Sequence, residues 1–162
     1  MQSTESPLKQ DYKDMIRIFL EEKVQFLLVG GIAVIFHGYV RMTKDIDLWI
    51  LASKENAESV VKALAKFGAP MQDISTDDFE HEGTIFQIGI EPIRIDIITK
   101  IAGLNFEEAN ANARTIEIED LKIPTISIQD LIKNKKASGR KQDLIDAEKL
   151  ERILEKQLAP FF

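Results

Sequence analysis

Three aspartates and a glycine pair are the residues of this chain whose types and spacing could support catalysis. Gly30 and Gly31 follow a short apolar run. Asp45 and Asp47 are separated by one residue, Ile46, in the next apolar segment, and Asp96 interrupts a later isoleucine-rich run. Mg²⁺ binds carboxylate oxygens together with substrate phosphates, and glycines let backbone N–H groups approach phosphate at the start of a helix. The combination indicates metal-assisted chemistry on a nucleotide.

The spacing of the acid pair sets its geometry if the segment is a strand. Side chains two residues apart in a strand face the same side, so Asp45 and Asp47 project together while Ile46 and Leu48 face the core. Their Cα atoms lie about 7 Å apart, and the two charges repel unless a cation lies between them. We therefore expect a divalent metal ion, Mg²⁺ or Mn²⁺, at this pair.

The third acid stands on the same strand face as Arg94 and Ile98. If this strand neighbours the one that carries Asp45, Asp96 can complete a set of three metal ligands. Such a set permits a two-metal arrangement, in which one ion activates an attacking hydroxyl and the other neutralises a triphosphate and its leaving pyrophosphate. Asp96 would serve as the base or as a ligand of the hydroxyl-side metal.

The residues around the acids could bind the phosphates. Arg41, Thr43 and Lys44 directly precede the acid pair and could donate hydrogen bonds to phosphate oxygens, while Gly30 and Gly31 seat the phosphate chain. Simpler interpretations stay open for each piece. The glycine pair could be a plain turn, and the acid pair an exposed strand motif. Asp96 could be the salt-bridge partner of a lysine.

Hydrophobic periodicity predicts the elements that position these residues. Helices are expected over residues 9–22, 32–36, 54–67, 106–112, 127–139 and 141–156. Strands are expected over residues 26–29, 45–51, 84–90, 93–99, 114–118 and 122–125. Ser53 and Ser127 are the predicted N-caps and Gly68 and Gly139 the predicted helix ends, and Glu91-Pro92 is expected to connect a hairpin.

The predicted fold class is α/β, with a mixed, twisted sheet flanked by helices. The 162 residues suit one domain. We expect a core over about residues 24–126 and a helical C-terminal segment over residues 127–162 that closes one side of a cleft.

Composition limits the classes of partner. The net charge of −6 and the pI near 5.0 disfavour broad binding to DNA or another polyanion. The basic residues within 133–141 could form a local patch or a solvated helix end. No apolar run is long enough for a membrane span, and Met1–Pro7 lacks the features of a signal peptide. With no cysteine, these features predict a cytoplasmic protein.

Two strings of the sequence carry a family resemblance. Val29-Gly30-Gly31 followed by Arg41-Met42-Thr43-Lys44-Asp45-Ile46-Asp47-Leu48 resembles the nucleotidyltransferase superfamily, which includes DNA polymerase beta and the minimal nucleotidyltransferases. The narrower Arg-x-Thr-x-Asp-x-Asp form is similar to nucleotidyltransferase-like proteins allied to AbiEii-type toxins of type IV toxin–antitoxin systems. The resemblance runs from about Val24 to Leu150.

The resemblance implies the nucleotidyltransferase fold and the transfer of a nucleoside monophosphate from an NTP onto a hydroxyl of RNA, protein or a small molecule. It also implies Mg²⁺ or Mn²⁺ as cofactor and a cognate antitoxin protein as a partner. In that group a helical lysine precedes an aspartate-containing motif, and the matching positions here are Lys135 and Asp143, with Asp146 as a further candidate. The large additional domain of the longer toxins is missing, so the acceptor stays open.

Several alternatives stay open beside this hypothesis. The chain could be a catalytically silent module that binds a nucleotide or a partner, or a structural partner of a toxin. Lys135 could be one more exposed lysine, and the helix dipole alone favours an acid at Asp143. His37 is expected to cap or pack rather than catalyse. Trp49 could stack on a base, although a core position is the simpler interpretation.

Overall fold

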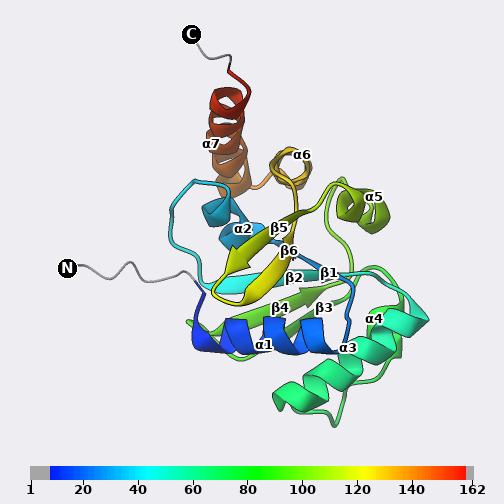
Figure 1. Ribbon diagram of the computed structural model, residues 1–162. Helices are drawn as coiled ribbons and strands as arrows, with labels where there is room; N and C mark the ends of the chain where they lie inside the picture. The colour runs from blue at the N-terminus through cyan, green and yellow to red at the C-terminus, as the bar shows by residue number, and fades with distance from the viewer. Residues whose placement is uncertain (1–7, 160–162) are drawn as a thin grey trace, which may run out of the picture.

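The computed structural model describes residues 8–159 of the chain (Figure 1). Met1–Pro7, on which the signal-peptide prediction rests, lies outside the described residues. The helices are α1 (Gln10–Glu21), α2 (Gly30–Phe36), α3 (Lys54–Phe67), α4 (Asp77–Glu80), α5 (Phe106–Ala111), α6 (Ile128–Ser138) and α7 (Lys141–Leu158). The strands are β1 (Phe26–Val29), β2 (Asp45–Ile50), β3 (Ile85–Ile88), β4 (Arg94–Ile98), β5 (Arg114–Ile118) and β6 (Leu121–Thr125).

The strands form one mixed sheet in the order β3-β4-β2-β1-β6-β5. The pairs β2–β4 and β1–β6 are parallel, whereas the central pair β1–β2 and the outer pairs β3–β4 and β5–β6 are antiparallel. Helices α1 and α3 lie on one side of the sheet, and α2, α5, α6 and α7 on the other (Figure 1). This architecture confirms the predicted fold class of a mixed sheet flanked by helices, with a helical C-terminal segment.

The sheet register brings the two acid-bearing strands together. Strand β2 pairs directly with β4, and Asp47 lies opposite Asp96. On its other edge β2 pairs with β1, where Val29, the residue before the glycine pair, lies opposite Asp47. The strand that carries Asp96 is therefore a direct neighbour of the strand that carries Asp45 and Asp47, which is the condition for Asp96 to be a third ligand.

The buried face of β2 anchors the site strand in the core. Ile46 and Leu48 are fully buried, as the alternation predicted. Trp49 is also buried and packs edge-on against Phe106, with ring centroids 5.1 Å apart. Trp49 is thus a core aromatic rather than an exposed platform for a base.

The predicted helix caps are present. The hydroxyl oxygens of Ser53 and Ser127 accept hydrogen bonds from backbone N–H groups three residues on, at 3.1 Å in each helix. Gly68 and Gly139 end these helices with φ values of 98° and 70°, a conformation that favours glycine. These local signals fix α3 and α6 without tertiary information.

Two predictions about the middle of the chain were wrong. The β3–β4 connection is longer than Glu91-Pro92, because β3 ends at Ile88 and a turn closed by the Ile93 N–H on the Ile90 carbonyl (2.9 Å) precedes β4. The short helix α4 was not predicted, since its four residues contain only one buried apolar residue, Phe79. The other helices and strands lie where they were predicted, within a few residues.

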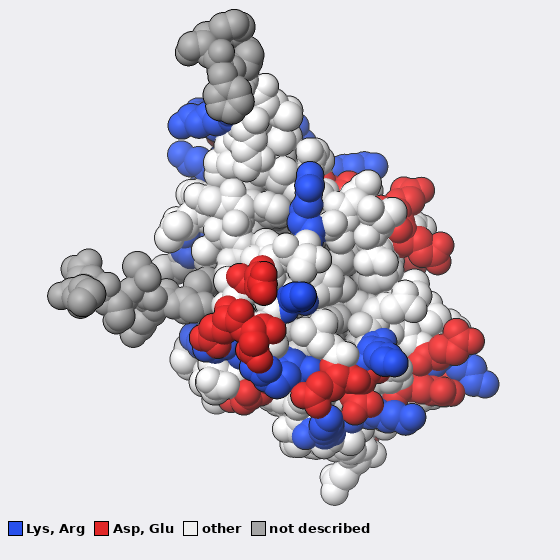
Figure 2. Space-filling model, viewed as in Figure 1, with Lys and Arg blue, Asp and Glu red and all other residues white. Residues whose placement is uncertain are grey.

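The surface and the helices fit the limits that composition set. Figure 2 shows acidic and basic side chains side by side over α1 and α3, rather than one continuous basic field on this face. Within residues 8–159, no helix combines the length and apolar character that crossing a membrane requires.

Candidate active site

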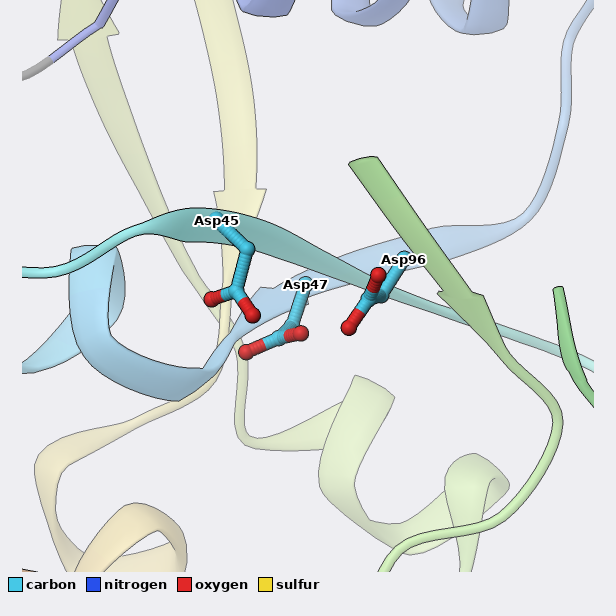
Figure 3. A group of neighbouring side chains, drawn as sticks. All are labelled: Asp45, Asp47 and Asp96. Atoms are coloured by element: carbon cyan, nitrogen blue, oxygen red, sulfur yellow. The ribbon is translucent and has the colours of Figure 1, made fainter. Parts of the chain in front are cut away.

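Three carboxylates converge at one place on the sheet. Asp45, Asp47 and Asp96 each offer an oxygen, and these oxygens all lie within 4.8 Å of one another. Figure 3 shows the side chains projecting from β2 and β4 toward the same space, beside the start of α2. Three hard oxygen ligands at this spacing suit a divalent cation such as Mg²⁺ or Mn²⁺.

The glycine pair allows the acid-bearing strand to approach α2. Gly30 has φ +71°, and a Cβ added there would lie 2.0 Å from Oδ2 of Asp47. A Cβ added at Gly31 would lie 2.6 Å from Oγ1 of Thr43. Any larger residue would collide with the acid pair or its flanking loop, so the pair is more than a plain turn.

The electrostatics of the three carboxylates are unfavourable without a cation. Burial, followed by repulsion from Asp45 and Asp96, raises the pKa of Asp47 to about 7. Burial also raises the pKa of Asp96. Grouped carboxylates that resist ionisation are common at functional sites, and a bound divalent cation would relieve their repulsion. The residues present therefore fit a metal ion.

Arg94 supplies positive charge inside the group. Its Nε donates to Oδ1 of Asp96 at 3.0 Å, and its Nη2 donates to both Asp45 Oδ2 and Asp96 Oδ2, the latter at 3.2 Å. The sequence analysis placed Arg94 on the same face as Asp96 but gave it no role. Its position two residues before the third acid was the signal that could have found it.

A second ionic cluster lies on α6 and α7. Nζ of Lys135 is 3.1 Å from Oδ1 of Asp143 and 3.1 Å from Oδ2 of Asp146. Lys135 is only 6% exposed, so the interpretation of it as an exposed lysine is wrong. We call Lys135, Asp143, Asp146 and their arginine partners, Arg41 and Arg140, the C-terminal ionic network.

Each acid of this network has several donors. Burial disfavours the ionised form of Asp143, but hydrogen bonds from Arg140, Ser138 and Lys135 outweigh it and lower the pKa to about 2. Asp146 is fully buried, and its pKa is also lowered, because the donors overcome the burial.

Arg41 connects this network to the loop before the acid pair. Its Nε and Nη2 each donate to the Asp146 carboxylate at 2.8 Å. The same guanidinium lies beside Gly31, with Nη2 3.3 Å from the position of an added Cβ. The network therefore ties α7 to the glycine pair, and Arg41 has a structural partner as well as a place in the cleft.

The two clusters border one cleft of about 630 Å³. Most of the predicted site residues line it, namely Gly30, Gly31, Arg41, Thr43, Asp45, Asp47, Asp96, Lys135 and Asp143. Lys44 and Asp146 are not in the lining: the exposed ammonium of Lys44 lies 3.7 Å from Glu91, and Asp146 is fully buried. His37 is also outside the cleft, and its Nε2 lies 2.7 Å from the Ile126 carbonyl, which fits the predicted packing role.

The side chains that line the cleft have a positive net charge, whereas the protein as a whole has a negative one. Among residues 8–159, four aspartates and five cationic residues line the cleft, although the net charge of the chain is −6. The cationic residues are Arg41, Arg94, Lys100, Lys135 and Arg140. A cleft with this lining suits an anionic ligand, more so once divalent cations are bound.

Comparison with solved structures identifies proteins of the same fold. The lincosamide antibiotic adenylyltransferase LnuA, in its lincomycin-bound structure, aligns with a TM-score of 0.57 and 21% identity, covering 92% of this chain and 99% of that one. The antibiotic-resistance factor ANT(2'')-Ia aligns with a TM-score of 0.59 and 16% identity, covering 92% of this chain and 83% of that one. The predicted nucleotidyltransferase fold is confirmed.

Comparison of the sequence with protein families gives the closer relationship. No curated protein matches the chain significantly. The model of a family described as "Nucleotidyl transferase of unknown function (DUF2204)" matches residues 8–159, nearly the whole chain, and that match includes the acid triad, the glycine pair and the C-terminal ionic network. The protein therefore belongs to this family of nucleotidyl transferases.

Proposed function

We propose that this protein uses divalent metal ions to transfer a nucleoside monophosphate from an NTP onto an acceptor hydroxyl. The convergence of three carboxylate oxygens within 4.8 Å, on one wall of a cleft rich in cationic side chains, is the observation that carries the proposal. Family membership supports the reaction class. The identity of the ion, the nucleotide and the acceptor goes beyond the family assignment.

In this proposal the aspartates hold the ions and orient the reacting groups. Asp45 and Asp47 bind Mg²⁺ or Mn²⁺ together with the triphosphate, and Asp96 completes the site on the acceptor side. Divalent ions held by these residues would supply charge neutralisation of the triphosphate and would lower the pKa of the attacking hydroxyl. Gly30 and Gly31 leave room for phosphate oxygens next to Asp47.

The cationic residues of the cleft would bind the phosphates. Lys135 lines the same cleft as the triad, and the charge of its ammonium partly opposes the rise in the pKa of Asp47. Because Asp143 and Asp146 hold that ammonium on one side, it can face a phosphate on the other. Arg41 and Thr43 line the same part of the cleft and supply further donors.

The transfer step requires one bond to form and one to break. The acceptor oxygen attacks the α-phosphorus of the NTP, and the bond from that phosphorus to the β-phosphate oxygen breaks, which releases pyrophosphate. The proton of the acceptor hydroxyl goes to a carboxylate oxygen of Asp96, whose pKa burial raises. The products are the nucleotidylated acceptor and pyrophosphate.

A small molecule is the acceptor class that we favour. Two proteins of the same fold were solved with small-molecule ligands, lincomycin in LnuA and adenylyl-2''-tobramycin in ANT(2'')-Ia. Beyond Asp96 the cleft wall consists mainly of neutral side chains from β3 and β4, Ile85, Gln87 and Ile98. Within residues 8–159, the acids in the lining are the triad and Asp143, so we expect an acceptor without several positive charges.

Radiolabelled NTPs test the proposal. The purified protein is incubated with Mg²⁺ and each α-labelled NTP, together with cell RNA, cell protein and a small-molecule extract. Labelling of one acceptor fraction that disappears in the Asp47→Asn variant supports the proposal. Asp120→Asn is the matched control, because Asp120 pairs with Arg17 on the surface outside the cleft. Labelling that survives in Asp47→Asn would exclude this site.

A second candidate function is a catalytically silent module that binds a nucleotide. The contact of Arg94 with two of the three carboxylates favours it, because the group has a partial counter-charge without an ion. Calorimetry with each NTP separates the two functions. Binding without labelling or pyrophosphate release in the experiment above would favour the silent module.

Four further expectations from the sequence stay predictions. The relationship to AbiEii-type toxins and a cognate antitoxin partner would be tested by expressing the chain in bacteria with and without its neighbouring genes. Growth arrest that a neighbouring gene relieves would support them. The single-domain organisation and the cytoplasmic location are also still to be tested, by limited proteolysis and by fractionation.

A further inference from the structure

Arg94 lies where a metal ion would have to bind. Its guanidinium donates three hydrogen bonds, one to Asp45 and two to Asp96, and thereby spans two of the three carboxylates of the triad. These bonds do not reach Asp47. Both oxygens of Asp96 and Oδ2 of Asp45 are thus bound to a positive group, which leaves Oδ1 as the Asp45 oxygen that Arg94 does not contact.

The sheet and helix α1 fix the position from which Arg94 reaches the triad. Arg94 is the first residue of β4 and pairs with Asp45 on β2. The backbone two residues before Arg94 is held at the start of α1, because the buried Tyr12 hydroxyl donates to the Pro92 carbonyl at 3.3 Å and Lys9, the N-cap residue of α1, donates to the same oxygen. The guanidinium therefore starts from an anchored backbone rather than from a free loop.

A guanidinium and a divalent cation cannot share these oxygens freely. Each hydrogen bond from Arg94 occupies a lone pair that would otherwise be open to the ion, and the two positive groups repel at contact distance. Long arginine side chains can rotate away, and Arg94 is still 28% exposed at the cleft wall, so it has somewhere to go.

We propose that Arg94 is a positioning residue of the metal centre: its guanidinium holds Asp45 and Asp96 together in the ion-free protein and must leave their oxygens when a divalent cation binds. The proposal rests on the proposed function only in that the triad binds metal, and it does not depend on nucleotidyl transfer. Arg94 thereby lowers the affinity for free ions while it keeps the ligands in place.

Manganese titration of variants tests the proposal without an activity assay. Arg94→Gln should bind Mn²⁺ about tenfold more tightly than wild type, because the competing hydrogen bonds are gone. Lys100→Gln is the matched control: it removes one positive charge from the same cleft, and within residues 8–159 Lys100 forms no ion pair. We expect less than about a twofold effect from the control, since its charge acts only at a distance.

The outcomes of the titration are distinct. A gain in Arg94→Gln alone supports the proposal, including the case in which only this variant binds Mn²⁺. Equal gains in both variants mean that Arg94 acts as general charge, and this overturns the proposal. Weaker binding in Arg94→Gln, or no binding in any variant, overturns it as well. A protein that passes this test but labels no acceptor would contradict the proposed function alone.

Nuclear magnetic resonance of the wild-type protein gives a second readout that needs no folded variant. The Nε–H signal of Arg94 should shift on Mg²⁺ saturation, because its bond to Asp96 breaks. The Nε–H signal of Arg41, which donates to Asp146, is the internal control and should stay in place. An unchanged Arg94 signal with bound Mg²⁺ would mean that the ion does not displace the guanidinium.

Discussion

The cleft borders two groups of aspartates whose charges are balanced in opposite ways. In the triad the acids face one another, and burial and repulsion raise the pKa of Asp47 to about 7. In the C-terminal ionic network the acids face cations, and the pKa of Asp143 falls to about 2 although it is also buried. Ionisation of an aspartate is thus unfavourable in the triad and favourable in the C-terminal ionic network. This difference separates the residues that we assign to chemistry from those that hold the cleft together.

The largest expected effect is on the triad. Replacing Asp47 or Asp96 by Asn should reduce nucleotidyl transfer by about a thousandfold or more, because each change removes a ligand of the metal centre. Initial rates of label incorporation measure the loss. Asp120→Asn should keep the wild-type rate. A triad variant that also keeps this rate would contradict the assignment of the triad to catalysis.

The network variants should instead affect stability. Asp146→Asn removes the carboxylate that pairs with Arg41 and one of the two that pair with Lys135, so we expect a loss of about 3 kcal/mol in the free energy of unfolding. Urea denaturation measures it. The Arg17–Asp120 pair is exposed and screened by solvent, so Asp120→Asn should leave the free energy of unfolding close to the wild-type value. Equal effects at Asp146 and Asp120 would show that the buried ion pairs stabilise the fold no more than an exposed pair does.

The dependence of the unfolding free energy on pH, on the acid side, tests the role of Asp143. Its pKa is depressed in the folded protein, so its contribution is complete above the unfolded pKa near 4 and is lost as the pH falls toward about 2. Asp143→Asn should therefore lower the unfolding free energy by about 2 kcal/mol near neutral pH, with the difference shrinking between about pH 4 and pH 2. A difference that is constant over this range would contradict the assignment.

Asp47 should show the opposite sign. Its pKa is raised in the folded protein, so its ionisation lowers stability as the pH rises from about 4 to about 7. In metal-free protein, Asp47→Asn should raise the unfolding free energy by about 1 kcal/mol above pH 7, and the gain should vanish below about pH 4. Chemical denaturation in the presence of a chelator checks this, and a variant that is less stable at high pH would show that the triad is not strained.

The local parts of the site could be predicted from the sequence. Strict alternation put Asp45 and Asp47 on one face and Ile46 in the core, and the structure confirms all three. The serine caps and terminal glycines of α3 and α6 were equally local. Such features depend on neighbours within a few residues, and a single sequence contains them.

The parts that depend on pairing could not be predicted. The sequence could state only that Asp96 would join the triad if its strand neighbours β2, because strand order and register are set by the whole sheet. Likewise the resemblance singled out Lys135 and Asp143 but did not predict that they form a buried ion pair. The contact of Arg94 with Asp45 also joins two neighbouring strands and could not be predicted, whereas its place two residues before Asp96 was a local signal that was not used.

The most direct test of the account is a crystal structure with Mn²⁺ and a non-hydrolysable NTP analogue. The account predicts anomalous manganese density about 2.2 Å from oxygens of Asp45, Asp47 and Asp96, with the triphosphate beside Gly30 and Gly31. A structure in which the analogue binds elsewhere, or in which the three carboxylates hold no ion at saturating Mn²⁺, would contradict it.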